Sequence, residues 1–364
     1  MTTMALPRGS LQAHQRLRGL GPNWFTIVMG TGIVANATAG LPLRFPGQRA
    51  AATGFWTLAA ALLIALTAVS VVHRDRIRAH ALDPAMAPFL GAPPMAMMTV
   101  GAGALLAGKD LVGPSAALTI DAVLWAIGTL TGLAGMAVVP YLMATRHARG
   151  LDDASPTWLM PVVPPMVSAA TGALLVPCLP PGTPRRVLLA GCAVMFALSL
   201  AASALIIALV WRRLAAIAAG PAQLIPTLWI VLGPLGQSIT AVCLLSRALP
   251  EPYGTAAVIY SVPVGGFALL WLCLATTITV RTARTTGGGL PFALTWWAFT
   301  FPVGTCVTGL SALAARTGPV SLRCPAAVLY ALLVLAWITV GGRTVRAIGR
   351  GEPAVRGGAD TLST

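Results

Sequence analysis

Charged residues are scarce in this sequence. Only 9% of the 364 residues are charged, against roughly 25% in an ordinary soluble domain, whereas 57% are apolar and the mean hydropathy is +0.82. A soluble fold cannot bury that much apolar surface and still present a polar exterior. The composition therefore excludes a disordered chain, a disulfide-rich secreted domain and a typical soluble enzyme, and it predicts a multi-pass membrane protein.

Ionisable residues are also missing from the middle of the apolar stretches. The four histidines lie in charged connecting segments and the six cysteines form no Cys-x-x-Cys pair, so we expect no metal site and no cofactor. Asp121 stands at the start of one apolar stretch, where we expect it to cap a helix near the membrane surface. The pattern argues against a carboxylate-based proton pump and against a cation channel with an acidic ring.

The formal net charge is +15, from 24 Lys and Arg against 9 Asp and Glu. No run of five like charges occurs and the aromatic residues lie in apolar stretches, so we expect no nucleic-acid site. Arginines confined to loops instead follow the positive-inside rule of membrane proteins.

Charges divide the chain into ten charge-free windows. In lipid the backbone must satisfy its own hydrogen bonds, so each window predicts a transmembrane helix and the fold class is an all-α polytopic membrane protein. A cleaved signal peptide ending near residues 35–37 is the alternative for the first window. The windows are 19–43, 50–73, 84–108, 122–145, 154–184, 187–211, 214–246, 252–280, 285–315 and 324–342.

Loop charges predict the orientation. Segments on the side of the two termini hold 16 of the Lys and Arg residues and the opposite segments hold 8, so we expect both termini in the cytoplasm and the protein in the cell membrane. The predicted organisation is a cytoplasmic segment over residues 1–22, a transmembrane domain over 23–345 and a cytoplasmic tail over 346–364.

Prolines and tryptophans recur with a period near 68 residues. Tryptophans at positions 24, 158, 229 and 296 precede Gly30, Pro164, Pro234 and Pro302 by five or six residues, and Pro94 takes the same place in the third window. Such a repeat predicts five helical hairpins, which can close into a quasi-fivefold ring around a central pore. The proline-bearing, odd-numbered helices are then kinked and lie inside the ring, with the even-numbered helices facing lipid.

Small and polar residues on the odd windows are the candidates for lining or kinking that pore. The alternative role for each is close packing between helices. The candidates are Gly30, Thr31, Gly32, Pro94, Pro164, Pro165, Pro234, Pro302 and Thr305.

Two motifs resemble one known family. The stretch PNWFTIVMGTGIVA over residues 22–35 and the stretch WWAFTFP over 296–302 are similar to the tellurite-resistance/dicarboxylate transporter family. That family includes plant slow anion channels, malate permeases and sulfite efflux pumps. The resemblance implies ten helices as five hairpins around a pore, and it alone implies a homotrimer.

The resemblance also implies a pore gate. A phenylalanine on the ninth helix blocks the pore in the channel branch, and Phe301 is the matching residue. Phe299 lies roughly 200° away around a helix, so only one of the two can face the axis. The alternative for Phe301 is a packing role in the core.

These observations predict transport of small anions through a central pore occluded by Phe301, in a channel-like or permease-like manner. The alternatives are a proton-coupled carrier for C4-dicarboxylates or sulfite and, from another class, a membrane-embedded enzyme. The scattered loop acids and histidines lack the spacing of a catalytic or metal site, so we expect no enzyme.

The orientation is testable with reporter fusions. Green fluorescent protein fused to the C-terminus should fluoresce in a bacterial host and alkaline phosphatase should be inactive there, because the positive-inside bias retains that end in the cytoplasm. The opposite pair of signals would contradict the orientation.

Overall fold

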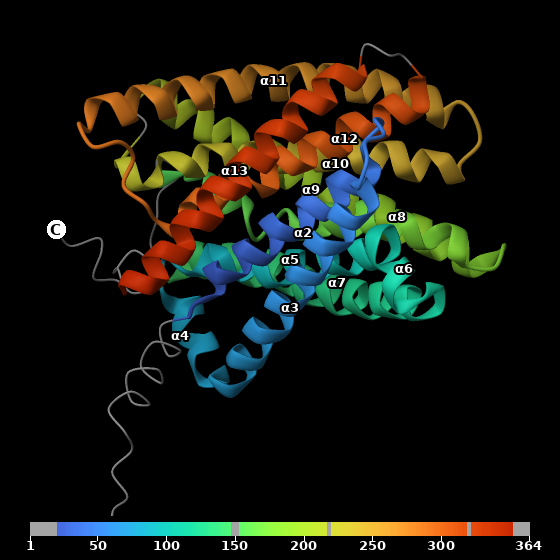
Figure 1. Ribbon diagram of the computed structural model, residues 1–364, viewed down its shortest axis with the longest axis horizontal. Coiled ribbons are helices and arrows are strands. Elements are labelled where there is room, and N and C mark those ends of the chain that lie inside the picture. The colour runs from blue at the N-terminus through green and yellow to red at the C-terminus, as the bar shows by residue number, and fades with distance from the viewer. Residues whose placement is uncertain (1–19, 147–152, 217–219, 319–321, 352–364) are drawn as a thin grey trace, which may run out of the picture.

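The computed structural model describes residues 20–146, 153–216, 220–318 and 322–351 (Figure 1). All regular structure in these ranges is helical, so the predicted all-α class is confirmed. The described part ends just after a helix that runs through Arg350, past the domain boundary predicted at residue 345. Most of the two predicted terminal segments lies outside the described residues.

Five buried helices form the interior. They alternate along the chain with five long helices that cover them, and the long helix α11 runs along one side of the interior in Figure 1, opposite α3 and α7. The inner helices are α2 (Phe25–Gly40), α5 (Ala92–Gly103), α8 (Pro164–Leu175), α10 (Leu232–Leu245) and α12 (Phe301–Thr317). The outer helices are α3 (Gln48–Val72), α7 (Pro114–Thr145), α9 (Thr183–Ala216), α11 (Tyr253–Thr285) and α13 (Arg323–Arg350).

Burial separates the two sets sharply. In the most apolar stretches of the three longest inner segments 67 to 78% of the residues are buried, against 17 to 22% in the outer helices. Exposed residues of the outer helices are largely apolar, among them Ile64, Leu130 and Leu270. Apolar surface of this kind is stable only against lipid. In the described residues the odd-numbered windows thus hold buried helices and the even-numbered windows hold helices with exposed apolar faces, and the contact of those faces with lipid stays a prediction.

Contacts between the inner helices close into a cycle. Helix α2 contacts α5, α5 contacts α8, α8 contacts α10, α10 contacts α12, and α12 contacts α2 again. Each outer helix packs on the inner helix that precedes it in the chain and on the next inner helix of the cycle. In the described residues, each inner helix is therefore paired with the outer helix that follows it, and the inner helices contact one another in a closed cycle.

Every inner helix is preceded by a short 3-10 helix. These segments carry the four repeated tryptophans, so the period seen in the sequence has a structural counterpart. The 3-10 helices are η1 (Pro22–Trp24), η3 (Ala87–Gly91), η6 (Pro156–Leu159), η8 (Ala222–Val231) and η10 (Leu294–Phe299).

The repeated prolines stand in the first turns of the inner α-helices, where each segment changes from 3-10 to α geometry, and a bend at these prolines stays a prediction. Pro164 and Pro302 occupy the first or second position of α8 and α12, and Pro94 and Pro234 the third position of α5 and α10. A first-turn N–H has no partner within its own helix, so proline costs little there. Helix α2, with Gly30 at the corresponding place, continues unbroken.

Eight helical segments in the described ranges are long and apolar enough to cross a membrane. The first and fifth predicted windows hold α2 and α8, which are too short to be counted among these eight. Flanking 3-10 turns, including η7 (Val176–Cys178), extend both helical segments. The number ten therefore stays a prediction. The remaining short elements are η2 (Arg74–Arg76), α4 (Ile77–Leu82), the π-helix η4 (Ala104–Gly108), α6 (Lys109–Val112) and η9 (Ser246–Ala248).

Asp121 does not cap a helix, contrary to the prediction. Helix α7 begins at Pro114 with Gly113 as its N-cap, so Asp121 lies beyond the first turn. The side chain is fully buried, at 0% exposure. The sequence placed it near the membrane surface because a carboxylate is expected to avoid the interior.

Glycines allow helices α10 and α12 to pack closely. A Cβ added to Gly236 would overlap the backbone of Thr305 and Cys306, and one added to Gly309 would lie 2.6 Å from the carbonyl oxygen of Gly236. The Thr305 hydroxyl also lies 3.3 Å and 3.2 Å from the carbonyl oxygens of Leu232 and Gly233. Backbone-to-backbone packing through small residues is the usual way that membrane helices associate.

Substituting Gly236→Ala should therefore destabilise the protein by about 1–3 kcal/mol, the usual cost of overpacking. The matched control is Gly266→Ala on the outer helix α11, where an added Cβ meets nothing within 4 Å. Thermal unfolding in detergent should show a lower midpoint for the first variant and an unchanged or higher one for the second. Equal midpoints would argue against the close α10–α12 contact.

Candidate functional site

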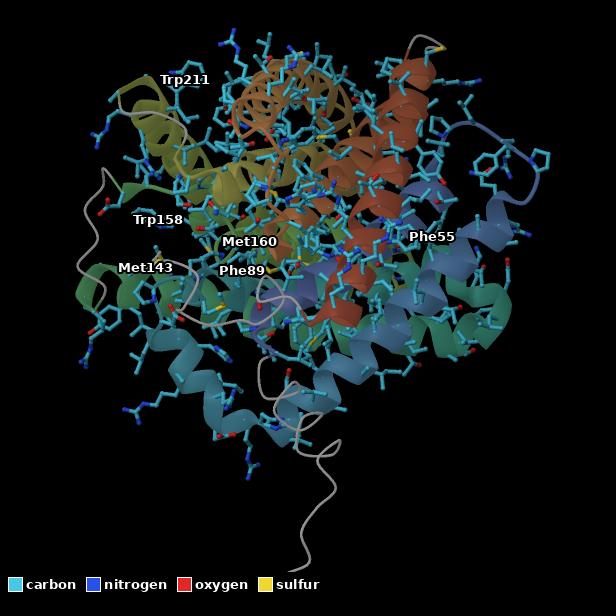
Figure 2. The ribbon with its side chains drawn as sticks, turned by 60° about the vertical axis from the view of Figure 1, so that its left-hand side comes forward. Phe55, Phe89, Met143, Trp158, Met160 and Trp211 are labelled. Carbon is cyan, nitrogen blue, oxygen red and sulfur yellow. The ribbon has the colours of Figure 1, made fainter. Side chains whose placement is uncertain are left out.

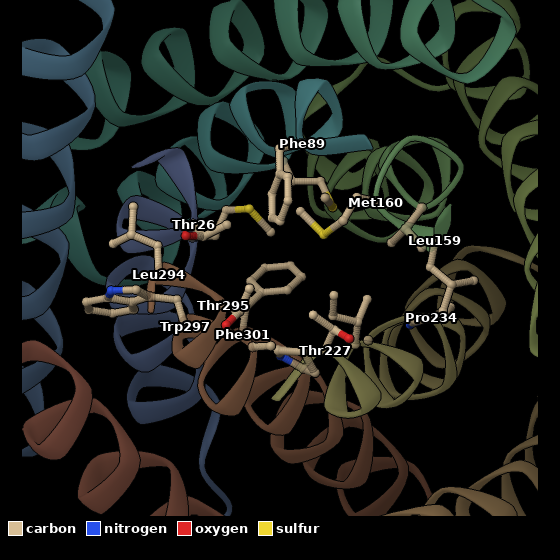
Figure 3. A pocket seen from close by; sticks show the side chains of 17 residues that line it. Thr26, Phe89, Leu159, Met160, Thr227, Pro234, Leu294, Thr295, Trp297 and Phe301 are labelled. Carbon is tan, nitrogen blue, oxygen red and sulfur yellow. The ribbon is translucent and has the colours of Figure 1, made fainter. Parts of the chain in front are cut away.

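A cavity of about 40 Å³ lies where the 3-10 helices meet the inner α-helices. All five inner segments contribute to its wall (Figure 3). Its volume holds a few water molecules at most. The lining residues used below are Thr26 and Met29 of the first segment, Phe89 and Met95 of the second, Met160 and Val163 of the third, Thr227, Ile230 and Pro234 of the fourth, and Thr295, Trp297, Phe301 and Pro302 of the fifth.

The ring of Phe301 projects into this cavity. It faces Phe89 and Met160, which come from two other inner segments and lie near each other in the interior (Figures 2 and 3). Phe301 is the first residue of α12, so its position is fixed by the start of a rigid helix. The side chain is 6% exposed, which means that the surrounding segments nearly enclose it.

Phe299 points elsewhere. Its ring meets Trp229 edge-on, with centroids 5.0 Å apart, and Trp296 in a similar geometry at 5.7 Å. The cavity wall includes Phe301 and not Phe299. Phe299 thus belongs to an aromatic cluster with Trp229 and Trp296, whereas Phe301 lines the cavity.

The side chains of the wall offer no free hydrogen-bond donor. The hydroxyls of Thr26, Thr227 and Thr295 donate to backbone carbonyl oxygens at 2.6, 2.6 and 2.8 Å. The indole N–H of Trp297 donates to Thr344, and the other lining side chains are apolar. An anion in this cavity would therefore find no free side-chain donor to replace its hydration.

The other predicted site residues lie around the cavity or away from it. Pro234 and Pro302 line it, whereas Pro94, Pro164 and Pro165 do not. A Cβ on Gly132 of α7 would lie 2.7 Å from the Cβ atom of Pro164 and 3.6 Å from that of Pro94. These two proline rings therefore face the outer helix α7, and Pro165 is buried in the first turn of α8.

Gly30, Thr31 and Gly32 are packing residues in this structure. Thr31 donates to the Ile27 carbonyl oxygen at 2.8 Å and accepts from the indole of Trp337 on α13 at 3.0 Å, so it points outward. A Cβ on Gly30 would meet Thr300 and Trp297, and one on Gly32 would lie 2.9 Å from Thr99.

Thr305 likewise lies between α10 and α12, where its hydroxyl donates to Pro302 O at 2.7 Å. It does not line the cavity. The packing role that the sequence left open is the one observed for Thr305 and for the three residues of α2.

Sequence reasoning missed most of the wall. Thr26, Phe89, Met160 and Ile230 all line the cavity and stand four or five residues before the repeated glycine or proline of their segment. This spacing is the signal that could have found them. It places one residue shortly before the repeated glycine or proline of each of these segments in the cavity wall.

Comparison with known proteins identifies the family. The model of the family described as "voltage-dependent anion channel" matches residues 19–345. The chain belongs to this family. The match covers the whole ring of inner and outer helices, and the resemblance to the tellurite-resistance/dicarboxylate transporters is confirmed. The protein is a membrane transporter of an anion-channel family.

Curated relatives extend over most of the chain. A sulfite efflux pump of Arthroderma otae is 26% identical over 342 residues, which cover 89% of each protein. The sulfite efflux pump of Arthroderma benhamiae is 28% identical over 305 residues, 79% of this chain and 80% of the relative. An uncharacterized transporter of Methanocaldococcus jannaschii is 28% identical over 299 residues, 80% of this chain and 82% of the relative.

Two threonines of α2 test the geometry of the wall. A small water-soluble thiol reagent should label Thr26→Cys, because Thr26 is only half-buried at the cavity wall, and should leave Thr31→Cys unlabelled, because Thr31 is 1% exposed and faces α13. Labelling is measured by mass spectrometry against the unsubstituted protein, whose six cysteines give the background. Equal labelling of the two variants would contradict this placement.

Proposed function

We propose that small inorganic anions cross the membrane along the axis of the inner ring, through the cavity, and that Phe301 occludes this path. In this proposal α2 and α8, together with their 3-10 turns, also span the bilayer, which gives ten spans as five hairpins in a quasi-fivefold arrangement. The single observation that carries it is the Phe301 ring in a cavity walled by all five inner segments.

Occlusion follows from volume and polarity. The cavity holds too little water for a hydrated anion, and its side-chain donors are engaged elsewhere. A narrow apolar constriction of this kind blocks ions by excluding water. Conduction then requires the Phe301 ring to move, and the small lining residues Gly233 and Ala298 leave space beside it.

Positive charge favours anions at the cavity end of the ring. The Arg343 guanidinium lies 4.6 Å from the centroid of the Trp296 ring, next to the aromatic cluster. With a net charge of +15, the chain raises the local concentration of anions near its surface. Selectivity for anions in this proposal comes from that field and from the absence of acidic side chains in the cavity wall.

Sulfite is the substrate that the curated relatives suggest, since two of them are named sulfite efflux pumps. We place the protein in the cell membrane with both termini in the cytoplasm, as a homotrimer, on the basis of the loop charges and the family. A proton-coupled carrier is the second candidate function. The buried carboxyl group of Asp121 is the observation that favours it.

The gate is tested by Phe301→Ala in proteoliposomes. Removal of the ring should raise nitrate flux severalfold, because the constriction becomes wider and wetter. Phe299→Ala is the matched control, because Phe299 belongs to the same motif but packs between Trp229 and Trp296.

Flux is followed with an anion-sensitive fluorophore inside the vesicles, at equal protein content. Unchanged flux in Phe301→Ala, or an equal increase in Phe299→Ala, would reject the gate assignment. If neither the wild-type protein nor Phe301→Ala conducts nitrate, anion conduction itself is rejected.

A further inference from the structure

Asp121 is a buried acid that the proposed path does not use. It lies inside the membrane-length helix α7, at 0% exposure, and neither carboxyl oxygen has a hydrogen-bond partner among the described residues. The other acids that the structure describes, Asp75, Asp83, Asp110, Asp153 and Glu251, are exposed or half-buried. Asp121 therefore stands apart from the acids that merely solvate loops.

The carboxyl group faces the inner helix α5. A Cβ added to Gly101 would lie 2.8 Å from Asp121 Oδ1, so only glycine at this position leaves room for the carboxyl. The π-helix η4 follows α5 directly and also contacts α7. Single-turn π-helices are frequent at functional sites, because they leave the backbone locally adjustable.

Neighbouring carbonyl groups of α5 are already occupied. The indole of Trp56 donates to Val100 O at 3.0 Å, and the amide of Asn36 donates to Thr99 O at 3.1 Å. These bonds tie α5 to α3 and α2 one or two residues before Gly101. They fix the position of the helix that the Asp121 carboxyl faces.

No positive charge of the described residues compensates the Asp121 carboxyl. Helices α5, α8, η3 and η4, which pack on α7, contain no charged residue. The charged or titratable residues of the other elements that pack there are Lys109 and Asp110 of α6, both exposed, and Arg78 and His80 of α4. An ionised carboxylate without partner or counter-charge is strongly unfavourable in such a place, so the geometry suits the protonated, neutral form.

We propose that Asp121 is a proton-binding site whose occupancy permits anion transport. This inference rests on the proposed anion path. Release of the proton to water leaves a carboxylate that requires water or donors, and these can enter only if α7 separates from α5 at Gly101. Helix α5 carries Met95, which lines the cavity, so a displacement of α5 changes the shape of the cavity wall.

Both consequences of ionisation act in the same direction. The carboxylate disturbs the inner ring, and its negative charge repels anions near the axis. Transport by the wild-type protein should therefore fall as pH rises. The steepest fall expected for a single titrating group is about tenfold per pH unit.

The experiment measures nitrate flux in proteoliposomes over a series of pH values that are equal inside and outside. Nitrate stays a single anionic species throughout, so any pH dependence belongs to the protein. Asp121→Asn retains the shape of the protonated carboxyl and should keep the low-pH flux at high pH. Asp110→Asn, the same change at an exposed acid on α6, should keep the wild-type profile.

A wild-type pH profile in Asp121→Asn, or a wild-type flux that does not depend on pH, would overturn the proposal. Infrared spectroscopy of the wild-type protein provides a second measurement that needs no variant and no transport. A carbonyl band of a protonated carboxyl group should be present at neutral pH and disappear on alkalinisation. If this band is absent at neutral pH, the proton site is rejected, even if nitrate flux is normal. If the band is present but the protein conducts no nitrate, only the proposed anion path is rejected.

Discussion

The constraint on which this structure depends is the need of every backbone polar group for a partner in a medium that offers none. The inner segments satisfy it while still changing from 3-10 to α geometry near the cavity. They do so by placing Pro94, Pro164, Pro234 and Pro302 in the first turn of an α-helix, where a missing N–H costs little. The cavity lies close to this change of geometry, and residues of all five inner segments line it.

Close packing between the segments follows from the same constraint. Without a hydrophobic driving force in lipid, helices associate through small residues and short contacts. Gly236 and Gly309 let the α10 and α12 backbones meet, and Gly101 makes room for the Asp121 carboxyl between α5 and α7. The hydroxyls of Thr31 and Thr305 bond to carbonyl groups of their own helices, so they add packing without polarity on the axis.

The cavity that results is lined mainly by apolar side chains, although the chain is strongly basic. Phe301 and the methionines supply the wall, and the charges remain outside it. In our proposal, the charged surfaces attract anions, whereas the apolar constriction decides whether the anions can pass. In our proposals, control of passage resides in small movements of the inner helices, and the buried carboxyl of Asp121 acts on them through its contact with α5 at Gly101.

The sequence by itself determined the all-helical class, the order of inner and outer helices and the repeat, because apolar length, loop charge and proline spacing are local properties. It also singled out Phe301 over Phe299, through the family motif. The tertiary structure alone decided that Thr31 turns outward, that Phe89 and Met160 line the cavity and that Asp121 is buried. Which side of a helix faces a neighbour depends on packing between segments far apart in the chain, and no local pattern records it.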